Sequence, residues 1–280
     1  MADYVLQALQ SADVEHVFVT QTEPGALARE LTSDGKTTFV SCNAARPSLA
    51  ESLICGGESI FDHFGEEAFR ECVAMVVPCD LPLVEAVDFD RLIDQCRERD
   101  ADIFFTIIRS RRLARAFPAR RFHSLYFDDL GDAYTMQAVV FISGRHIGFE
   151  SSPSGSRRLV ITDRAGKEVR GLPELVEVLR KRRHGLMMRS WWSAYKIFLG
   201  RLLAGGNILS VLRIAVGATR RRATVQVIQH VFRQALNLEC AFLESNTTEL
   251  SADVDSDRDL EEIRPAVGRR HAGLRRDRVA

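Results

Sequence analysis

The chain has 280 residues, 46% of them hydrophobic, which is enough for one large domain or one domain with a sizeable appendage. Its 38 Lys and Arg residues balance 38 Asp and Glu residues, so no overall basic field draws it onto nucleic acid, and we expect no specific nucleic-acid partner. Six cysteines without CxxC spacing indicate reduced, mostly buried thiols. The acidic N-terminus lacks the pattern of an export signal, which favours a cytoplasmic protein.

Strands and helices alternate over the first hundred residues. The apolar spacing predicts helices at about 4–9, 26–31, 47–53 continuing to 66–71, and 89–99, and strands at 16–20, 37–41, 72–78 and 102–108. The 72–78 strand (CVAMVVP) is a continuous apolar run, which is typical of a central parallel strand covered on both faces. The predicted fold class is therefore α/β, with a Rossmann-like, mostly parallel mixed sheet flanked by helices.

The pattern changes in the second half of the chain. Two extended segments, 122–127 and 134–143, are predicted to be joined by an acidic glycine turn, and a late strand is expected at 238–245. A helical subdomain is predicted at about 173–237, inserted in an α/β domain that spans 1–263, and the basic tail 264–280 is predicted to be disordered.

The aromatic and basic stretch Trp191–Ala215 lies in that helical region. Packing against the sheet is the expectation, and peripheral membrane contact through an interfacial helix is the alternative. Two arginines within the most apolar stretch, Ile197–Val216, argue against a transmembrane helix.

Asp80 directly follows the predicted central strand. Ligands of parallel α/β sheets bind beyond the carboxyl ends of the strands, so this carboxylate is expected to face a ligand crevice and to suit Mg²⁺. The alternative is that Asp80 caps the turn or the next helix.

A second acidic cluster lies late in the chain, at Asp253, Asp255, Asp257 and Asp259. A calcium loop is disfavoured because the required glycine and distal glutamate are missing. One interpretation is that Ser256 or Asp257 caps a helix over 258–263. The other is that one of these carboxylates faces Asp80 and completes a metal site.

The segment VVPCDLPLVEAVDFDRLIDQCRERDADIFFTII resembles the centre of MobA-like nucleotidyltransferases, and DVDSDRDLEEI resembles their terminal aspartate element. The resemblance implies a nucleotidyltransferase or GT-A type of sheet. It also implies transfer of a nucleotidyl group from an NTP to a phosphorylated or polar small-molecule acceptor, with release of pyrophosphate. By the same resemblance Asp80 and Asp255 are catalytic and bind Mg²⁺, with Asp253 as a further metal ligand.

The resemblance also places a nucleotide contact near Arg46, Ser48 and Ser52, where an ordinary helix start is the alternative. The family begins with a strand and a Gly-rich phosphate loop, and this sequence starts after both. Either the start site is placed too late or the chain is a shortened relative with impaired catalysis. At 134–138 the flexible glycine of the family's acceptor loop is absent, and Gln137 offers an amide instead.

The arginines between Arg109 and Arg121 follow the strand at 102–108. They are candidates to approach phosphates from the substrate side, with a solvated loop as the alternative. Two rival functions stay open. One is a non-catalytic nucleotide- or sugar-nucleotide-binding protein. The other is a GT-A glycosyltransferase, which normally carries a D-x-D motif, whereas Leu81 and Pro82 follow Asp80 here.

Overall fold

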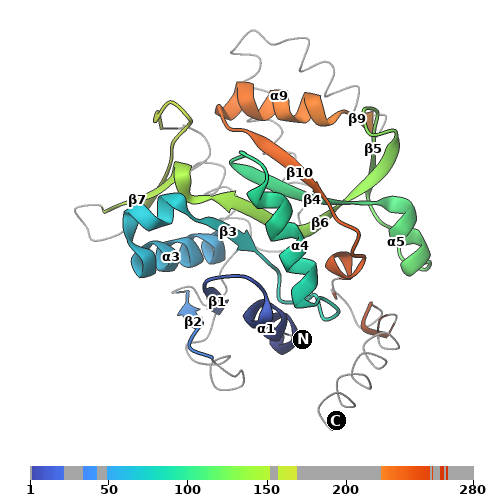
Figure 1. The fold of residues 1–280 in the computed structure, drawn as a ribbon, viewed down its shortest axis with the longest axis horizontal. Coiled ribbons are helices and arrows are strands. Elements are labelled where there is room, and N and C mark those ends of the chain that lie inside the picture. The colour runs from blue at the N-terminus through green and yellow to red at the C-terminus, as the bar shows by residue number, and fades with distance from the viewer. Residues whose placement is uncertain are drawn as a thin grey trace.

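The computed structural model describes residues 2–21, 34–42, 49–151, 157–168, 222–252, 254, 259–261 and 263. The strands are β1 (Val17–Gln21), β2 (Thr37–Ser41), β3 (Val73–Val76), β4 (Ile103–Arg109), β5 (Ser124–Phe127), β6 (Asp132–Ser143), β7 (Ile147–Ser151), β8 (Arg157–Ile161), β9 (Arg222–Ala223) and β10 (Cys240–Glu244). The helices are α1 (Ala2–Ser11), α3 (Leu49–Glu71), α4 (Ala86–Arg97), α5 (Ser110–Ala116) and α9 (Val225–Leu236), with short 3₁₀ turns η1 (Gly144–His146) and η2 (Glu249–Ser251). The order of elements is visible in Figure 1.

The central sheet is built around the long strand β6. Its strand order is β10-β4-β6-β5-β9, and β3 pairs with the second half of β6. β6 is antiparallel to β3, β4 and β5, while β10 is parallel to β4 and β9 is parallel to β5. All strands of this sheet except β6 therefore run in one direction, which confirms the predicted mostly parallel mixed α/β sheet.

The prediction for the strand before Asp80 needs a correction. The apolar run yields only four strand residues, Val73–Val76, and among the described residues they pair with the antiparallel β6 rather than with a parallel neighbour. β3 is not covered on both faces either, because Val73 is 47% exposed and the next three residues are half-buried. The direction of the strand is as predicted, since β3 and β4 both run opposite to β6.

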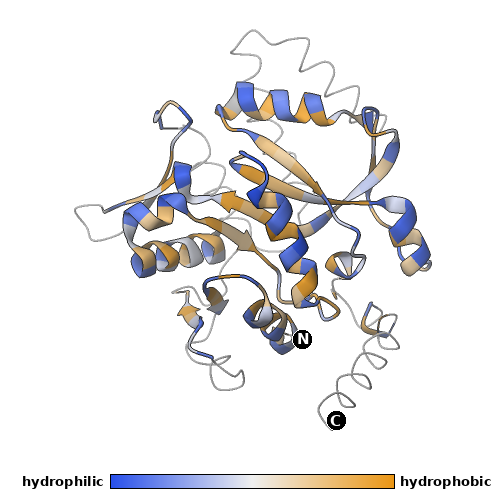
Figure 2. Cartoon of the chain, viewed as in Figure 1, coloured by the Kyte–Doolittle hydropathy of each residue, from blue (hydrophilic) through white to orange (hydrophobic). Residues whose placement is uncertain are grey.

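The main core lies between the sheet and α4, on which α1 also packs. α4 begins with a capping box, in which Glu85 and Asp88 exchange side-chain and backbone hydrogen bonds, and it buries Phe89 and Leu92. On the sheet, Phe104, Val139 and Phe141 complete this core. Figure 2 shows the pattern that drives the packing: the strands are largely hydrophobic, and the helices carry their polar residues away from the sheet.

A smaller parallel pair, β1 and β2, forms a sheet of its own against α3. The helix expected at 26–31 lies outside the described residues, as does most of the predicted helical subdomain, residues 173–221. The helix α9 near the end of that subdomain is present as predicted. The six cysteines are free, and Cys42, Cys96 and Cys240 are buried.

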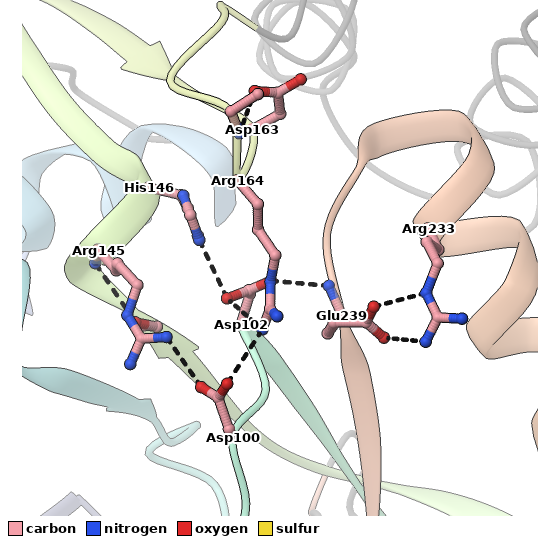
Figure 3. Close-up of polar contacts among 10 residues, drawn as sticks. Asp100, Asp102, Arg145, His146, Asp163, Arg164, Arg233 and Glu239 are labelled. Atoms are coloured by element: carbon pink, nitrogen blue, oxygen red, sulfur yellow. Dashed lines mark hydrogen bonds and ion pairs between the residues drawn. The ribbon is translucent and has the colours of Figure 1, made fainter.

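A buried ion-pair cluster ties the amino ends of the strands together (Figure 3). Asp102 precedes β4, and only 2% of its side chain is exposed. Its Oδ1 accepts hydrogen bonds from His146 Nε2 (3.0 Å) and Arg164 Nη2 (3.2 Å). Its Oδ2 accepts from Arg164 Nε (2.8 Å) and from the Glu239 N–H (2.7 Å) that precedes β10. The cluster therefore joins β4, β10 and the segment after β8.

The charges of this cluster are balanced. Burial would raise the pKa of Asp102, but the hydrogen bonds from Arg164 and the Glu239 N–H, together with His146, hold that pKa below its ordinary value. Hydrogen bonds from Arg233 likewise lower the pKa of Glu239. Because Asp102 has four donors for its two oxygens, we interpret this cluster as structural.

Candidate functional site at the carboxyl edge

Asp80 lies in a tight turn between β3 and α4, and the residues after it are firmly anchored. Leu81, Leu83 and Val84 are at most 6% exposed. Leu81 and Val84 enter the main core, whereas Leu83 enters a second core with Leu113 and its neighbours. This alternation of core contacts fixes the turn, so the backbone of Asp80 has a defined place beyond the carboxyl end of β3.

The carboxyl ends of β4 and β10 lie at the same edge of the sheet as Asp80, because these strands share the direction of β3. Arg109 and Glu244 end the two strands, and Arg109 Nε lies 2.8 Å from Glu244 Oε1. The hydrogen bond to Glu244 raises the pKa of Arg109, so this guanidinium stays charged. This edge of the sheet is where α/β folds bind ligands.

The late segment, defined as residues 245–263, returns to this edge and contacts Asp80 directly. The backbone N–H of Val254 donates to the carbonyl oxygen of Asp80 at 3.2 Å. Ala252, Val254 and Ile263 pack with Leu83 in the second core, where Ala252 and Ile263 are at most 1% exposed. Two motifs that are remote in sequence are thus adjacent in the fold.

Buried polar contacts hold the late segment onto β6 and α4. The side-chain N–H₂ of Gln137 donates to the Thr247 carbonyl (2.8 Å) and to Ser251 Oγ (3.1 Å). Thr247 Oγ1 donates in turn to Asp88 Oδ1 at 2.9 Å. The late segment thus accepts both hydrogen bonds of the Gln137 N–H₂ group, and a contact of the Gln137 amide with the acceptor substrate stays a prediction. The sequence gives no signal for the role of Thr247, which looks like an ordinary loop residue.

Only some of the residues predicted to bind the metal or the nucleotide lie in the part of the chain that the structure describes. Asp80 lies at the carboxyl edge, and its Oδ1 is shielded from solvent. Asp253 and Asp255 lie outside the described residues, as do Arg46 and Ser48. Ser52 lies near the start of α3, and its nucleotide contact stays a prediction. Within the described part of the chain, no three His, Cys, Asp or Glu residues gather in a group that could hold a metal ion.

The basic run is a solvated loop only in part. It covers the end of β4, then α5 and the irregular segment after it, and several of its arginines have protein partners although Arg112, Arg115 and Arg121 are exposed. Arg111 pairs with Asp132 (3.3 Å), and Arg112 donates to the carbonyl of Asn246 (3.3 Å). Arg120 pairs with Asp259 at 2.7 Å. The basic run and the late acidic cluster, which the sequence presents separately, therefore contact each other.

A mixed α/β sheet with one antiparallel strand, and an acidic turn at its carboxyl edge met by a late segment, defines the chain as a protein of the nucleotidyltransferase type of fold. The profile of the MobA-like NTP transferase domain matches residues 1–181. The chain belongs to this family, as its central and terminal motifs predicted.

The chain is similar to several solved structures, and the first of those named here supports the fold. A hypothetical transferase from Thermus thermophilus is similar with a TM-score of 0.57 and 17% identity, over 93% of this chain and 85% of that one. A 4-diphosphocytidyl-2C-methyl-D-erythritol synthase from Anaerococcus prevotii gives a TM-score of 0.42 at 7% identity, over 92% and 81% of the two chains. A CMP:2-keto-3-deoxy-manno-octonic acid synthetase in complex with CTP gives 0.44 at 9% identity, over 96% and 87%.

No curated protein sequence matches the chain. In the part of the chain that the structure describes, none of the helices combines the length and the apolar character that crossing a membrane requires.

Proposed function

We propose that this chain is a Mg²⁺-dependent nucleotidyltransferase that moves a nucleotidyl group from an NTP to a phosphorylated or polar small molecule, releasing pyrophosphate. Asp80 and Asp255 are the proposed catalytic metal ligands, with Asp253 as a further ligand. Membership of the MobA-like NTP transferase domain family supports the reaction class.

The observation that carries the proposal is the hydrogen bond from the Val254 N–H to the carbonyl oxygen of Asp80. Val254 stands between Asp253 and Asp255 in the sequence, so the residue that contacts Asp80 is the immediate sequence neighbour of both aspartates. The donor set fits a hard divalent cation, because carboxylate oxygens are the ligands that Mg²⁺ prefers. Bound there, Mg²⁺ supplies positive charge for the triphosphate and orients it for in-line attack.

The protein's own contribution is positioning. Leu81 and Leu83 fix the turn that carries Asp80, and Gln137 and Thr247 fix the segment that carries the late aspartates. In this proposal such anchoring pre-organises the carboxylate ligands, which lowers the cost of assembling the site for each turnover.

One observation favours a second candidate, a protein that binds nucleotides without turning them over. Arg109, Arg111 and Arg120 are each paired with an acidic side chain, and Arg112 donates to a backbone carbonyl. Few cations of the basic run are thus left for a triphosphate. The two candidates differ in one product, since only the transferase releases pyrophosphate.

The test measures calorimetric binding of ATP, GTP, CTP and UTP with and without Mg²⁺, for the wild type and for Asp80→Asn. We expect the Mg²⁺-dependent affinity for one or more nucleotides to fall at least about tenfold in Asp80→Asn, because replacing even a residue that only orients a metal ligand typically costs about 10- to 100-fold. The unfolding temperature should stay close to that of the wild type. Unchanged Mg²⁺–NTP affinity in Asp80→Asn contradicts the site assignment.

Glu98→Gln is the matched control, because it removes one carboxylate charge from an exposed position at the end of α4. It should bind nucleotides as the wild type does. Pyrophosphate release in the presence of a panel of phosphorylated and polyhydroxyl acceptors then separates the two candidates. Binding without release from any acceptor favours the binding protein.

A further inference from the structure

Arg120 contacts the late segment on both sides of Val254. Its Nη2 lies 2.7 Å and its Nε 3.3 Å from Oδ1 of Asp259. Its Nη1 donates to the carbonyl oxygen of Ser251 at 3.4 Å. Ser251 and Asp259 flank Val254 in the sequence, so one guanidinium connects the two flanks of the stretch that is hydrogen-bonded to Asp80.

The guanidinium of Arg120 is itself held in place. Its carbon lies 5.9 Å from the centre of the Phe117 ring, and the Arg120 N–H donates to the Phe117 carbonyl at 3.1 Å. Only 11% of the Arg120 side chain and 21% of the Asp259 side chain are exposed. Solvent therefore screens this pair much less than an ordinary surface ion pair.

Apolar packing completes the attachment at the same place. Phe117, which stacks with Arg120, belongs to the second core together with Ala252, Val254 and Ile263. The packing brings the late segment to the turn of Asp80, and the directional contacts of Arg120 fix its position along that turn. A planar fork with several donors suits this double contact, which a lysine cannot reproduce.

We propose that Arg120 is a positioning residue for the divalent-cation site: by holding Ser251 and Asp259 together it keeps the aspartates beside Val254 in register with Asp80. This inference rests on the proposed function, since it assigns to those aspartates the ligation of Mg²⁺. Arg120 itself touches neither the cation nor the nucleotide in this assignment. Residues that orient metal ligands typically change metal affinity by about 10- to 100-fold when they are replaced.

The experiment compares Arg120→Met with Arg121→Met in the full chain. Arg121 is the adjacent residue and is exposed, so its replacement removes the same charge without removing the contacts to Ser251 and Asp259. Hydrogen exchange of peptides covering 245–263 is measured without ligand, and the Mg²⁺ dependence of nucleotide binding is measured in parallel. If Arg120→Met does not fold, Asp259→Asn and Arg120→Lys take its place.

We expect faster exchange in 245–263 and about 10- to 100-fold weaker apparent Mg²⁺ affinity in Arg120→Met, with a much smaller change in turnover at saturating Mg²⁺. Arg120→Lys should show an intermediate loss of Mg²⁺ affinity, because lysine keeps the positive charge but lacks the several N–H donors of the planar guanidinium. Arg121→Met should match the wild type in both measurements.

Three results overturn the inference. Wild-type exchange across 245–263 in Arg120→Met shows that the guanidinium does not hold the segment. Faster exchange with unchanged Mg²⁺ affinity shows that holding the segment does not position the ligands. A wild-type protein that binds no Mg²⁺–NTP overturns the proposed function and the metal-positioning role with it. In that case the exchange measurement still decides whether Arg120 holds the segment.

Discussion

Replacing Asp102 by Asn tests how strongly the ion-pair cluster at the amino edge stabilises the fold. The two oxygens of Asp102 accept four hydrogen bonds, two on each oxygen, and each oxygen accepts one of them from Arg164. An asparagine side chain of the same shape turns one oxygen into an N–H₂ group. Whichever oxygen is replaced, two donors lose their acceptor and Arg164 loses its buried counter-charge.

The magnitude follows from this burial. Breaking a buried ion pair by removing one partner costs about 3–5 kcal/mol, and leaving a buried donor unsatisfied adds about 1–3 kcal/mol. Arg164 is 33% exposed, so part of its charge is solvated after the substitution. We therefore expect a loss of about 2–4 kcal/mol in the free energy of unfolding, a substantial part of the roughly 5–15 kcal/mol of a typical domain.

The chain provides a matched control two residues away. Asp100 carries the same charge and pairs with Arg145, but 70% of its side chain is exposed. Asp100→Asn removes a solvated ion pair, so its effect on stability should be far smaller. Equilibrium urea unfolding at pH 7 measures both variants. If Asp102→Asn and Asp100→Asn lose the same free energy of unfolding, the argument that burial makes the Asp102 contacts strongly stabilising is refuted.

The same cluster predicts a pH dependence. The folded-state pKa of Asp102 lies below its ordinary value of 3.8, because the hydrogen bonds from Arg164 and the Glu239 N–H outweigh burial. A carboxylate with a lowered folded pKa contributes its stability above the unfolded pKa and loses it as the pH falls through the folded pKa. The stability difference between the wild type and Asp102→Asn should be full at pH 7 and shrink below about pH 4.

Two further predictions need only simple assays. Gly144→Ala should lower the free energy of unfolding, measured in urea, by about 3 kcal/mol, because a Cβ there would lie 1.9 Å from the Phe69 carbonyl oxygen. Gly148→Ala is the control, because a Cβ at that position meets no atom within 4 Å. A thiol reagent at pH 8 should modify the exposed Cys79 rapidly. It should modify Cys240 slowly, because burial and the Glu239 charge raise the pKa of Cys240 to about 12; equal rates would contradict this.

Much of the fold follows from local patterns. The strands at β2, β4 and β10 were predicted within two residues, because short runs of β-branched and aromatic residues carry their own signal. The β5–β6 hairpin is also as predicted, with Gly131 at a positive φ of 65° in the acidic turn, where glycine has no steric cost.

What the sequence does not contain is the order of strands in space. The run of apolar residues before Asp80 looks like a central parallel strand, because central parallel strands also consist of consecutive apolar residues. In the structure β6 lies between β3 and β4, and pairs with both. Pairing of this kind depends on contacts between segments far apart in the sequence, which no local window records.

The candidate site also depends partly on local sequence patterns and partly on contacts between distant segments. The position of Asp80 at the ligand-binding edge could be predicted from the sequence, because Asp80 directly follows a strand and ligands bind beyond the carboxyl ends of strands. The role of Arg120 was not, because Arg120 and Arg121 are identical in type and adjacent in sequence. Only Arg120 is largely buried and pairs with Asp259, 139 residues away. A basic run alone cannot distinguish an arginine that holds the protein together from one that is available to phosphate.

The two edges of the sheet differ in how completely their polar groups are satisfied. At the amino edge, both oxygens of the buried Asp102 have donors, which suits a cluster whose task is stability. At the carboxyl edge, Oε1 of Gln137 is buried and accepts no hydrogen bond from the described residues, although its amide N–H₂ is fully engaged. A buried acceptor without a donor costs about 1–3 kcal/mol, and natural sequences keep such costs mainly at functional sites. This buried acceptor is consistent with the proposed site at the carboxyl edge, next to the segment that contacts Asp80.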